Sequence, residues 1–97
     1  MPRGYMISAH RTTADPEKAT AYRALAIPAL EAAGGTFLAA GGRVVAKENG
    51  RDERTILIEF ESFEAAVAAY ESDAYQLALA ALDGGANRDI RLFEGVE

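Results

Sequence analysis

The clearest pattern of apolar and polar positions runs from Arg54 to Leu82. Its first part alternates, with Ile56, Ile58 and Phe60 on one side of the backbone and a mixed set of residues between them. A period of two is typical of a strand whose two faces meet different surroundings. From Ser62 onward the apolar residues recur at helical spacing, so this stretch predicts a strand that leads directly into a helix.

The rest of the chain adds elements of the same two kinds. Asp15-Pro16-Glu17 predicts a helix start, because aspartate caps a helix and proline is tolerated at its first position. Gly34-Gly35 predicts the end of this helix, and Ser72-Asp73 begins a further helical piece after the first strand–helix unit. Three other segments are expected to be strands: 5–12, 36–46 and 88–94.

The resulting order, β-α-β-β-α-β, predicts a ferredoxin-like α+β fold in a single domain spanning residues 1–97. We expect a four-stranded antiparallel sheet with the strands ordered fourth, first, third, second, and the helices on one face. The helix-facing residues would be Tyr5, Ile7, Ile56, Ile58, Phe60, Ile90 and Leu92. The helix-free face would carry Met6, Ser8, His10, Thr55, Leu57, Glu59, Arg91 and Phe93. That second face is too apolar to be left in water, so a second copy of the chain is the simplest cover.

The composition of the chain argues against two classes of partner, nucleic acids and membranes. The net charge is −5, and the ten basic residues are scattered rather than clustered, which argues against a nucleic-acid partner. There is no cysteine, and no apolar run approaches transmembrane length, so we expect a cytoplasmic protein without a membrane partner.

A series of short motifs over nearly the whole chain is shared with one family: Tyr5, Asp15-Pro16, Tyr22, Pro28, Gly34-Gly35, Gly41-Gly42, Ile58-Glu59-Phe60, Ser62-Phe63-Glu64-Ala65-Ala66, Tyr70, Ser72, Tyr75 and Glu94-Gly95. On these residues the chain resembles domain of unknown function 1330, in the dimeric α+β barrel superfamily. The resemblance implies a homodimer whose sheets pack face to face, with a cavity on the helix-free side. Two positions depart from the family pattern, Ala69 where tryptophan is common and Leu82 where arginine is common.

His10 is the only histidine and therefore the only imidazole available for catalysis. If the first and last strands are antiparallel neighbours, His10 should approach Asp89, and Ser8 should approach Arg91. A carboxylate that orients an imidazole is the arrangement a general base needs, so His10 and Asp89 are candidate catalytic residues. The alternative is that His10 sits partly exposed at a strand end without a role.

Glu59 is the one acidic residue within an otherwise apolar strand. Facing a cavity, it would have a raised pKa and act as an acid or base, or it would pair with Arg91. Arg91 in turn would bind a carboxylate or enolate. The alternative for both is a salt bridge at the seam of the dimer.

The sequence shows no nucleotide-binding fingerprint, and one histidine with scattered carboxylates offers no metal-ligand spacing, so we expect neither cofactor nor metal. Two functions remain open. The first is a small-molecule-binding protein or cofactor-free enzyme that holds a small organic molecule in the cavity. The second is a non-catalytic dimer that binds a metabolite or uses its polar groups only at the interface. Whether the protein is an enzyme stays open.

Overall fold

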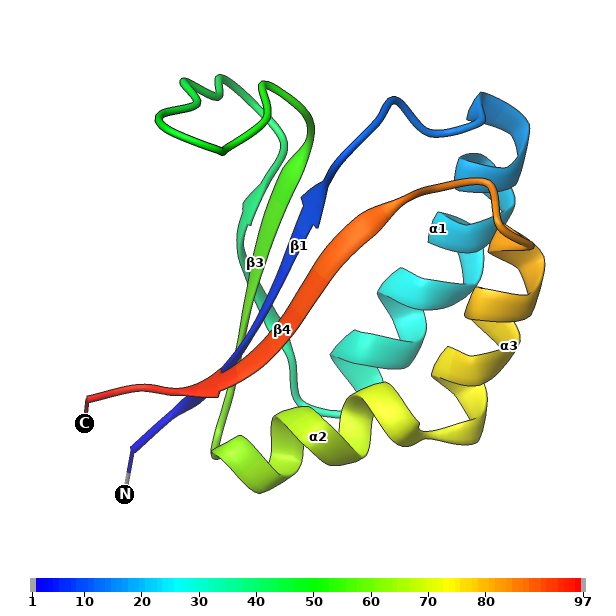
Figure 1. Ribbon diagram of the computed structural model, residues 1–97. Coiled ribbons are helices and arrows are strands. Elements are labelled where there is room, and N and C mark those ends of the chain that lie inside the picture. The colour runs from blue at the N-terminus through cyan, green and yellow to red at the C-terminus, as the bar shows by residue number, and fades with distance from the viewer. Residues whose placement is uncertain (1, 97) are drawn as a thin grey trace.

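The computed structural model, which describes residues 2–96, consists of one sheet with helices along one side (Figure 1). The elements are β1 (Gly4–His10), α1 (Pro16–Ala32), β2 (Thr36–Ala40), β3 (Thr55–Phe60), α2 (Phe63–Glu71), α3 (Asp73–Leu82) and β4 (Arg88–Glu94). The predicted α+β, ferredoxin-like fold is confirmed. None of the described helices has both the length and the apolar character needed to cross a membrane.

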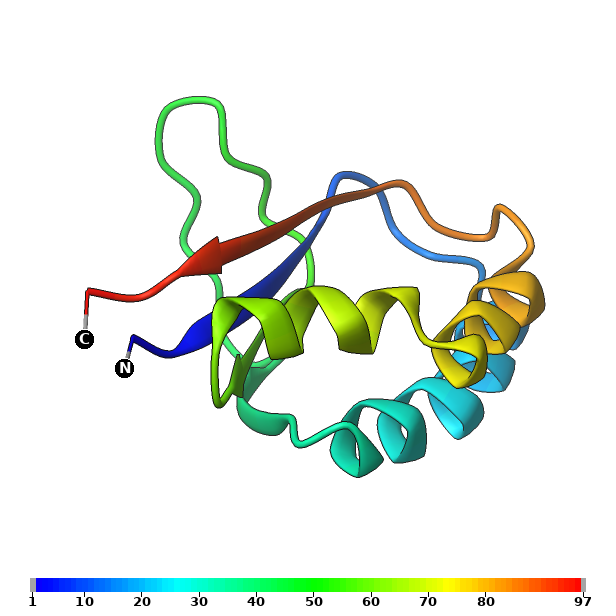
Figure 2. The ribbon, with the colours of Figure 1, turned by 90° about the horizontal axis from the view of Figure 1, so that it is seen from below.

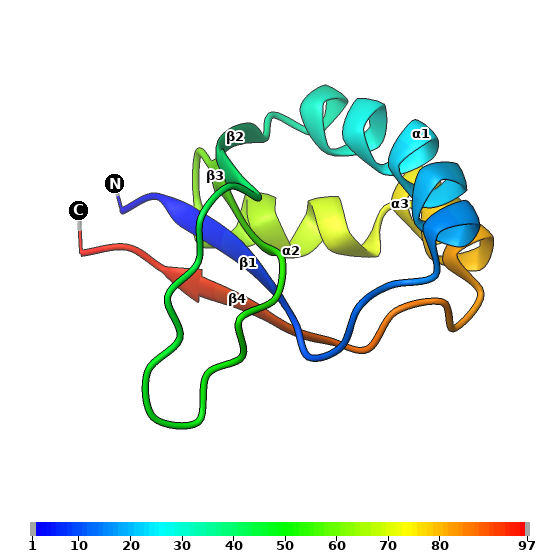
Figure 3. The same ribbon diagram turned by 90° about the horizontal axis from the view of Figure 1, so that it is seen from above.

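The four strands are antiparallel in the order β2-β3-β1-β4, as predicted. The helices all lie on the same side of this sheet, with α2 crossing near one end and α1 and α3 beside the other (Figure 2). β2 is shorter than predicted and ends at Ala40, because Gly41 and Gly42 both have positive φ angles, of 88° and 83°. The connection from there to β3 extends away from the helices (Figure 3).

Polar caps begin the helices where the sequence predicts them. The side chains of Asp15, Ser62 and Ser72 each accept a backbone N–H in the first turn of a helix. Ser72 acts on two helices at once, since its Oγ accepts from Tyr75 N at 3.2 Å and donates to the carbonyl of Ala69 at 2.8 Å. One residue therefore ends α2 and starts α3, which produces the bend between them.

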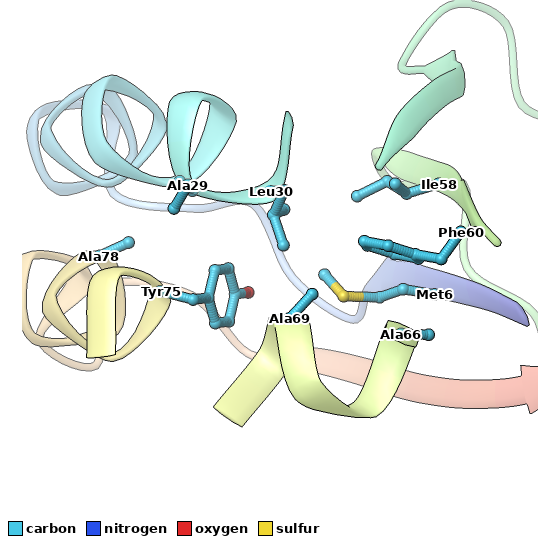
Figure 4. Packing of buried hydrophobic residues seen from close by; sticks show 10 residues of the cluster. Met6, Ala29, Leu30, Ile58, Phe60, Ala66, Ala69, Tyr75 and Ala78 are labelled. Atoms are coloured by element: carbon cyan, nitrogen blue, oxygen red, sulfur yellow. The ribbon is translucent and has the colours of Figure 1, made fainter. Parts of the chain in front are cut away.

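The core lies between the helix-facing side of the sheet and all three helices (Figure 4). Its largest fully buried side chains are Met6, Leu30, Ile58, Phe60 and Tyr75. Alanines on the helices fill the positions between them and allow the helices to approach the sheet closely.

β1 faces the opposite way from the prediction. Its register places Met6 beside Ile58 and Leu92, so Met6 belongs to the helix-facing side. Tyr5 and Ile7, predicted to face the helices, lie on the helix-free side instead. The predicted faces of β3 and β4 are confirmed, and the error is confined to β1.

Gly4 explains the orientation of β1. It is buried on the helix-facing side, where β1 passes under the start of α2. A Cβ atom at Gly4 would overlap the carbonyl oxygen of Ser62, so only glycine fits there. Because strand residues alternate, this position places Met6, Ser8 and His10 on the helix-facing side as well.

Candidate functional site

A cleft of about 340 Å³ opens between α1 and the helix-facing side of the sheet, at the end where β1 finishes and β4 begins. We call it the outer cleft, and its charged and polar lining residues are His10, Thr13, Thr20, Tyr22, Arg23, Glu53, Arg54 and Arg88. A smaller space of about 200 Å³, the inner hollow, lies deeper along α1. The two spaces share Tyr22, Arg23, Arg54 and Ile56, so they adjoin.

Arg88, the first residue of β4, is held in a hydrogen-bonded network at the wall of the outer cleft. Its Nη1 donates to the Tyr22 hydroxyl at 3.0 Å, and the guanidinium carbon lies 4.8 Å from the centre of the Tyr22 ring. The Tyr22 hydroxyl also shares a 2.7 Å hydrogen bond with the hydroxyl of the fully buried Tyr75. Burial raises the pKa of Tyr75, so its phenol stays protonated.

This network orients Arg88 without neutralising it. Arg88 forms no salt bridge with a carboxylate among residues 2–96, and a guanidinium has five N–H donors, so donors remain for an anion in the cleft. The network also joins three elements, since Tyr22 lies on α1, Tyr75 on α3 and Arg88 on β4. The position of Arg88 is therefore set by the same packing that closes the core.

His10 is the direct cross-strand neighbour of Arg88 and faces the same cleft. Partial burial is the largest cause that lowers the pKa of His10, and the nearby charges of Arg88 and Arg54 lower it further. Glu53 acts in the opposite direction. The imidazole is therefore neutral at pH 7 and able to accept a proton.

The predicted approach of His10 to Asp89 is wrong. The register pairs Asp89 with Ala9, so its side chain projects from the helix-free face, whereas His10 faces the helices. Asp89 instead binds Arg91, whose Nε and Nη2 donate to its two carboxylate oxygens at 3.2 and 3.3 Å. The cause is the orientation of β1, since a shift of one residue moves a side chain to the other face. Ser8 is likewise paired with Ile90 and not with Arg91.

Glu59 and Arg91 share the helix-free face but do not contact each other in the subunit. Glu59 Oε2 accepts a 3.2 Å hydrogen bond from the Tyr5 hydroxyl, and Arg91 is bound to Asp89. The Tyr5 ring stacks on Phe93 with 5.6 Å between ring centres. Three of the four predicted site residues thus lie on the helix-free face, and only His10 lies at the outer cleft. Their catalytic roles stay predictions.

Positive charge gathers at the outer cleft although the whole chain is acidic. Arg23, Arg54 and Arg88 line it, and Glu53 is the carboxylate among its lining residues. Glu53 accepts hydrogen bonds from the hydroxyl of Thr13, the shorter at 3.2 Å. Within residues 2–96 the salt bridges are Lys18–Asp83 and Arg91–Asp89, and neither uses an arginine of the cleft.

Two functional candidates escaped the sequence reasoning. Arg88 was seen only as the start of the last strand, although the correct register of β1 would have placed it opposite His10. Ser8 is only 3% exposed and lines the inner hollow, yet its Oγ has no hydrogen-bond partner among the described residues. The same part of the chain contains no cluster of three or more residues suited to hold a metal ion.

Comparison with solved structures supports the fold. A protein of unknown function from Rhodopseudomonas palustris aligns with a TM-score of 0.74 and 17% identity, over 99% of this chain and 84% of the other. A Caulobacter crescentus protein described as a candidate antibiotic biosynthesis monooxygenase gives 0.59 and 16%, over 99% and 91%. A dimeric ferredoxin-like protein of unknown function from Thermobifida fusca gives 0.52 and 14%, over 96% and 91%. No curated protein matches the sequence significantly.

At such low identities the structural similarity establishes the fold alone. The sequence itself carries a stronger match, because residues 3–96 fit the family described as a domain of unknown function (DUF1330). The match covers nearly the entire chain and agrees with the resemblance carried by the short motifs. This chain belongs to the DUF1330 family.

Proposed function

We propose that the protein binds a small organic anion in the outer cleft. The observation that carries the proposal is the convergence of Arg23, Arg54 and Arg88 on one cleft without a salt-bridge partner among residues 2–96. Arginine is suited to carboxylate recognition because its planar donors match the two oxygens. Arg88 is the best placed, since Tyr22 already holds it.

The size and walls of the outer cleft favour a small molecule over a macromolecule. Its volume of about 340 Å³ lies in the range of small-molecule sites. Pro16, Ala19, Ile56 and Leu82 supply apolar surface between the charged groups. Such a combination suits an organic acid with an apolar body, whose carboxylate meets the arginines while its carbon atoms meet these walls.

The proposal is tested by calorimetric titration with benzoate and with benzyl alcohol, its uncharged counterpart. We expect Arg54→Gln to weaken benzoate binding by about tenfold or more, because hydrogen bonds to charged groups contribute about 1.5–3 kcal/mol. The matched control is Arg51→Gln, which removes the same charge from an exposed loop position outside the cleft. Equal binding of benzoate and benzyl alcohol, or equal loss in both variants, would contradict the proposal.

A catalytic extension rests on His10. A neutral imidazole beside two arginines is able to take a proton from a ligand whose resulting negative charge those arginines stabilise. The candidate monooxygenase among the fold neighbours adds support by fold analogy only. The test is exchange of a ligand C–H for deuterium, followed by NMR, which His10→Gln should abolish while binding persists. Exchange that continues in His10→Gln would remove this role and leave anion binding as the function.

We also propose that the protein is a homodimer in which a second copy covers the helix-free face. Tyr5, Ile7, Leu57 and Phe93 form an apolar strip across that face, and Phe93 is 41% exposed in the subunit. The charged groups on this face are already held within the subunit, by Tyr5–Glu59 and Asp89–Arg91 contacts. Burial of this apolar strip favours the pairing. The cavity expected between two sheets depends on this pairing.

A further inference from the structure

The Ser8 hydroxyl is a buried polar group without a hydrogen-bond partner among residues 2–96. The residue is 3% exposed, and no described atom forms a hydrogen bond with its Oγ. A buried donor and acceptor of this kind costs free energy unless something binds it. Because Ser8 lines the inner hollow, that space is where a partner would lie.

The position of Ser8 relates it to the anion site. Ser8 and His10 lie two residues apart on the same face of β1, which separates them by roughly 7 Å along the strand. His10 lines the outer cleft and Ser8 the inner hollow, and the two spaces meet at Tyr22 and Arg54. An elongated ligand with its anionic end at the arginines would therefore extend toward Ser8.

The walls of the inner hollow define what joins the two ends of such a ligand. They are mainly apolar and include Met6, Ala26, Leu30, Phe37 and Ile58. Surfaces of this kind favour a hydrocarbon or aromatic body, whereas a second charged group placed against Met6, Leu30 or Ile58 would be desolvated. A volume of about 200 Å³ allows one ring or a short chain but not a large polycyclic body.

We propose that the ligand is an elongated monocarboxylate that carries a second, uncharged oxygen group at its far end, and that Ser8 hydrogen-bonds to this group. The inference rests on the proposed anion site, which it extends into the inner hollow. An aromatic acid with a hydroxyl group directly across the ring fits the separation between the two ends. The Ser8 hydroxyl both donates and accepts, so it pairs with a phenol or with a carbonyl oxygen.

A modest rearrangement completes the contact. The Oγ atom itself is shielded from solvent, although Ser8 lines the hollow. Rotation about the single side-chain torsion of serine would bring Oγ to the ligand. Side-chain rearrangements of this size are common on binding.

The experiment compares benzoate, 3-hydroxybenzoate and 4-hydroxybenzoate by calorimetric titration on wild type and Ser8→Ala. We expect wild type to bind 4-hydroxybenzoate about three- to tenfold more tightly than benzoate, as one net hydrogen bond provides. We expect Ser8→Ala to abolish this preference while it binds benzoate as wild type does. The 3-hydroxy compound, whose hydroxyl is misplaced, should gain less than the 4-hydroxy compound in wild type.

The outcomes separate the two proposals. If benzoate binds and depends on Arg54, but the 4-hydroxyl gives no gain or its gain survives in Ser8→Ala, the Ser8 contact is overturned and the anion site stands. If none of the three acids binds wild type, both proposals fall. Ser8→Ala removes a hydroxyl that has no partner in the part of the chain that the structure describes, so a folded variant is expected, and circular dichroism checks this before titration.

Discussion

The two faces of the sheet use their charged residues in opposite ways. On the helix-free face Arg91 is bound to Asp89, and Glu59 accepts a hydrogen bond from Tyr5. On the helix-facing side Arg54 and Arg88 line a cleft, and neither takes part in a salt bridge among residues 2–96. The arrangement on the helix-free face suits a protein–protein interface. The arrangement on the helix-facing side suits a binding site for a small anion.

This difference shows why residue type alone is a poor guide to function. Glu59 and Arg91 are conspicuous in the sequence because they interrupt apolar strands, yet each already has a partner in the subunit. Arg88 is inconspicuous at the start of a strand, yet Tyr22 on α1 holds it beside the only histidine. The unspent hydrogen-bonding capacity of a group, rather than its rarity, indicates where a ligand would bind.

The substitutions with the largest expected effect on stability test which side chains of β1 face the helices. Met6 and Ile7 are neighbours in sequence but lie on opposite faces, and Met6 is 1% exposed while Ile7 is only partly buried. Met6→Ala should lower the unfolding free energy by about 2–5 kcal/mol, because it leaves a cavity in the core. Ile7→Ala should cost about half of that or less when urea unfolding is followed at low protein concentration.

Met6→Leu is the control for this pair, since a swap of similar volume should cost less than about 1.5 kcal/mol. A greater loss for Ile7→Ala than for Met6→Ala would reverse the assignment of the faces. It would also return His10 to the side of Asp89, and the outer cleft would lose its histidine.

The sequence predicted the fold well and the site poorly, for one physical reason. In β3 the contrast between Ile58 or Phe60 and Glu59 is strong, so the buried face is evident from alternation alone. In β1 alternation favours the wrong face, because Tyr5, Ile7 and Ala9 are the more apolar set while Met6, Ser8 and His10 include two polar residues. The orientation of β1 is set instead by the contact of Gly4 with the start of α2, more than fifty residues later in the chain.

That one error reached every prediction about a side chain of β1. With β1 reversed, His10 faces Arg88 instead of Asp89, and Ser8 enters the core layer instead of approaching Arg91. The Tyr22–Tyr75 hydrogen bond was equally out of reach, because helical spacing shows that both residues face inward but not that their hydroxyls meet. Helix starts, by contrast, depend on local capping residues and were predicted correctly.

The substitution with the next largest expected effect tests whether a second copy of the chain covers the helix-free face. Phe93→Glu places a charge within the proposed interface and should weaken dimerisation by at least about a hundredfold, since burial of an unpaired charge costs several kcal/mol. Sedimentation velocity over a concentration series measures the change. Leu77→Glu is the matched control, because Leu77 is 64% exposed on α3, away from the sheet.

If wild type sediments as a single subunit at micromolar concentration, the dimer and the cavity between sheets are both wrong. The outer cleft would remain, because α1, β1, β3 and β4 of one subunit form its walls. The two faces are therefore separable by experiment, one through assembly and the other through ligand affinity.

A smaller effect follows from the pKa of His10, which burial and then Arg88 and Arg54 lower below its usual 6.5, with Glu53 opposing them. A bound carboxylate would offset the two arginine charges and raise this pKa, so binding takes up a proton. Benzoate affinity should then rise as the pH falls from 8 to 5.5, by no more than about tenfold, given that one pKa unit corresponds to tenfold and solvent screens an exposed site.

His10→Gln should remove this pH dependence in the same titrations while the protein still binds benzoate through the arginines. An affinity that is independent of pH in wild type would show that His10 does not sense the ligand charge. A pH dependence that persists in His10→Gln would show that His10 is not its source.

The smallest expected change in stability comes from two serine-to-alanine substitutions, one at a serine whose hydroxyl is hydrogen-bonded within the fold and one at a serine whose hydroxyl is not. Ser62 Oγ accepts the Ala65 backbone N–H at 3.0 Å and caps α2, whereas Ser8 Oγ has no partner among residues 2–96. Ser62→Ala should therefore lower the unfolding free energy by about 1 kcal/mol. Ser8→Ala should leave it unchanged or raise it by about 1 kcal/mol, because a buried unsatisfied hydroxyl is removed. Urea unfolding without ligand measures both. A loss in Ser8→Ala as large as that in Ser62→Ala would mean that the fold itself uses the Ser8 hydroxyl, and the ligand would then have no unsatisfied group to meet at the end of the inner hollow.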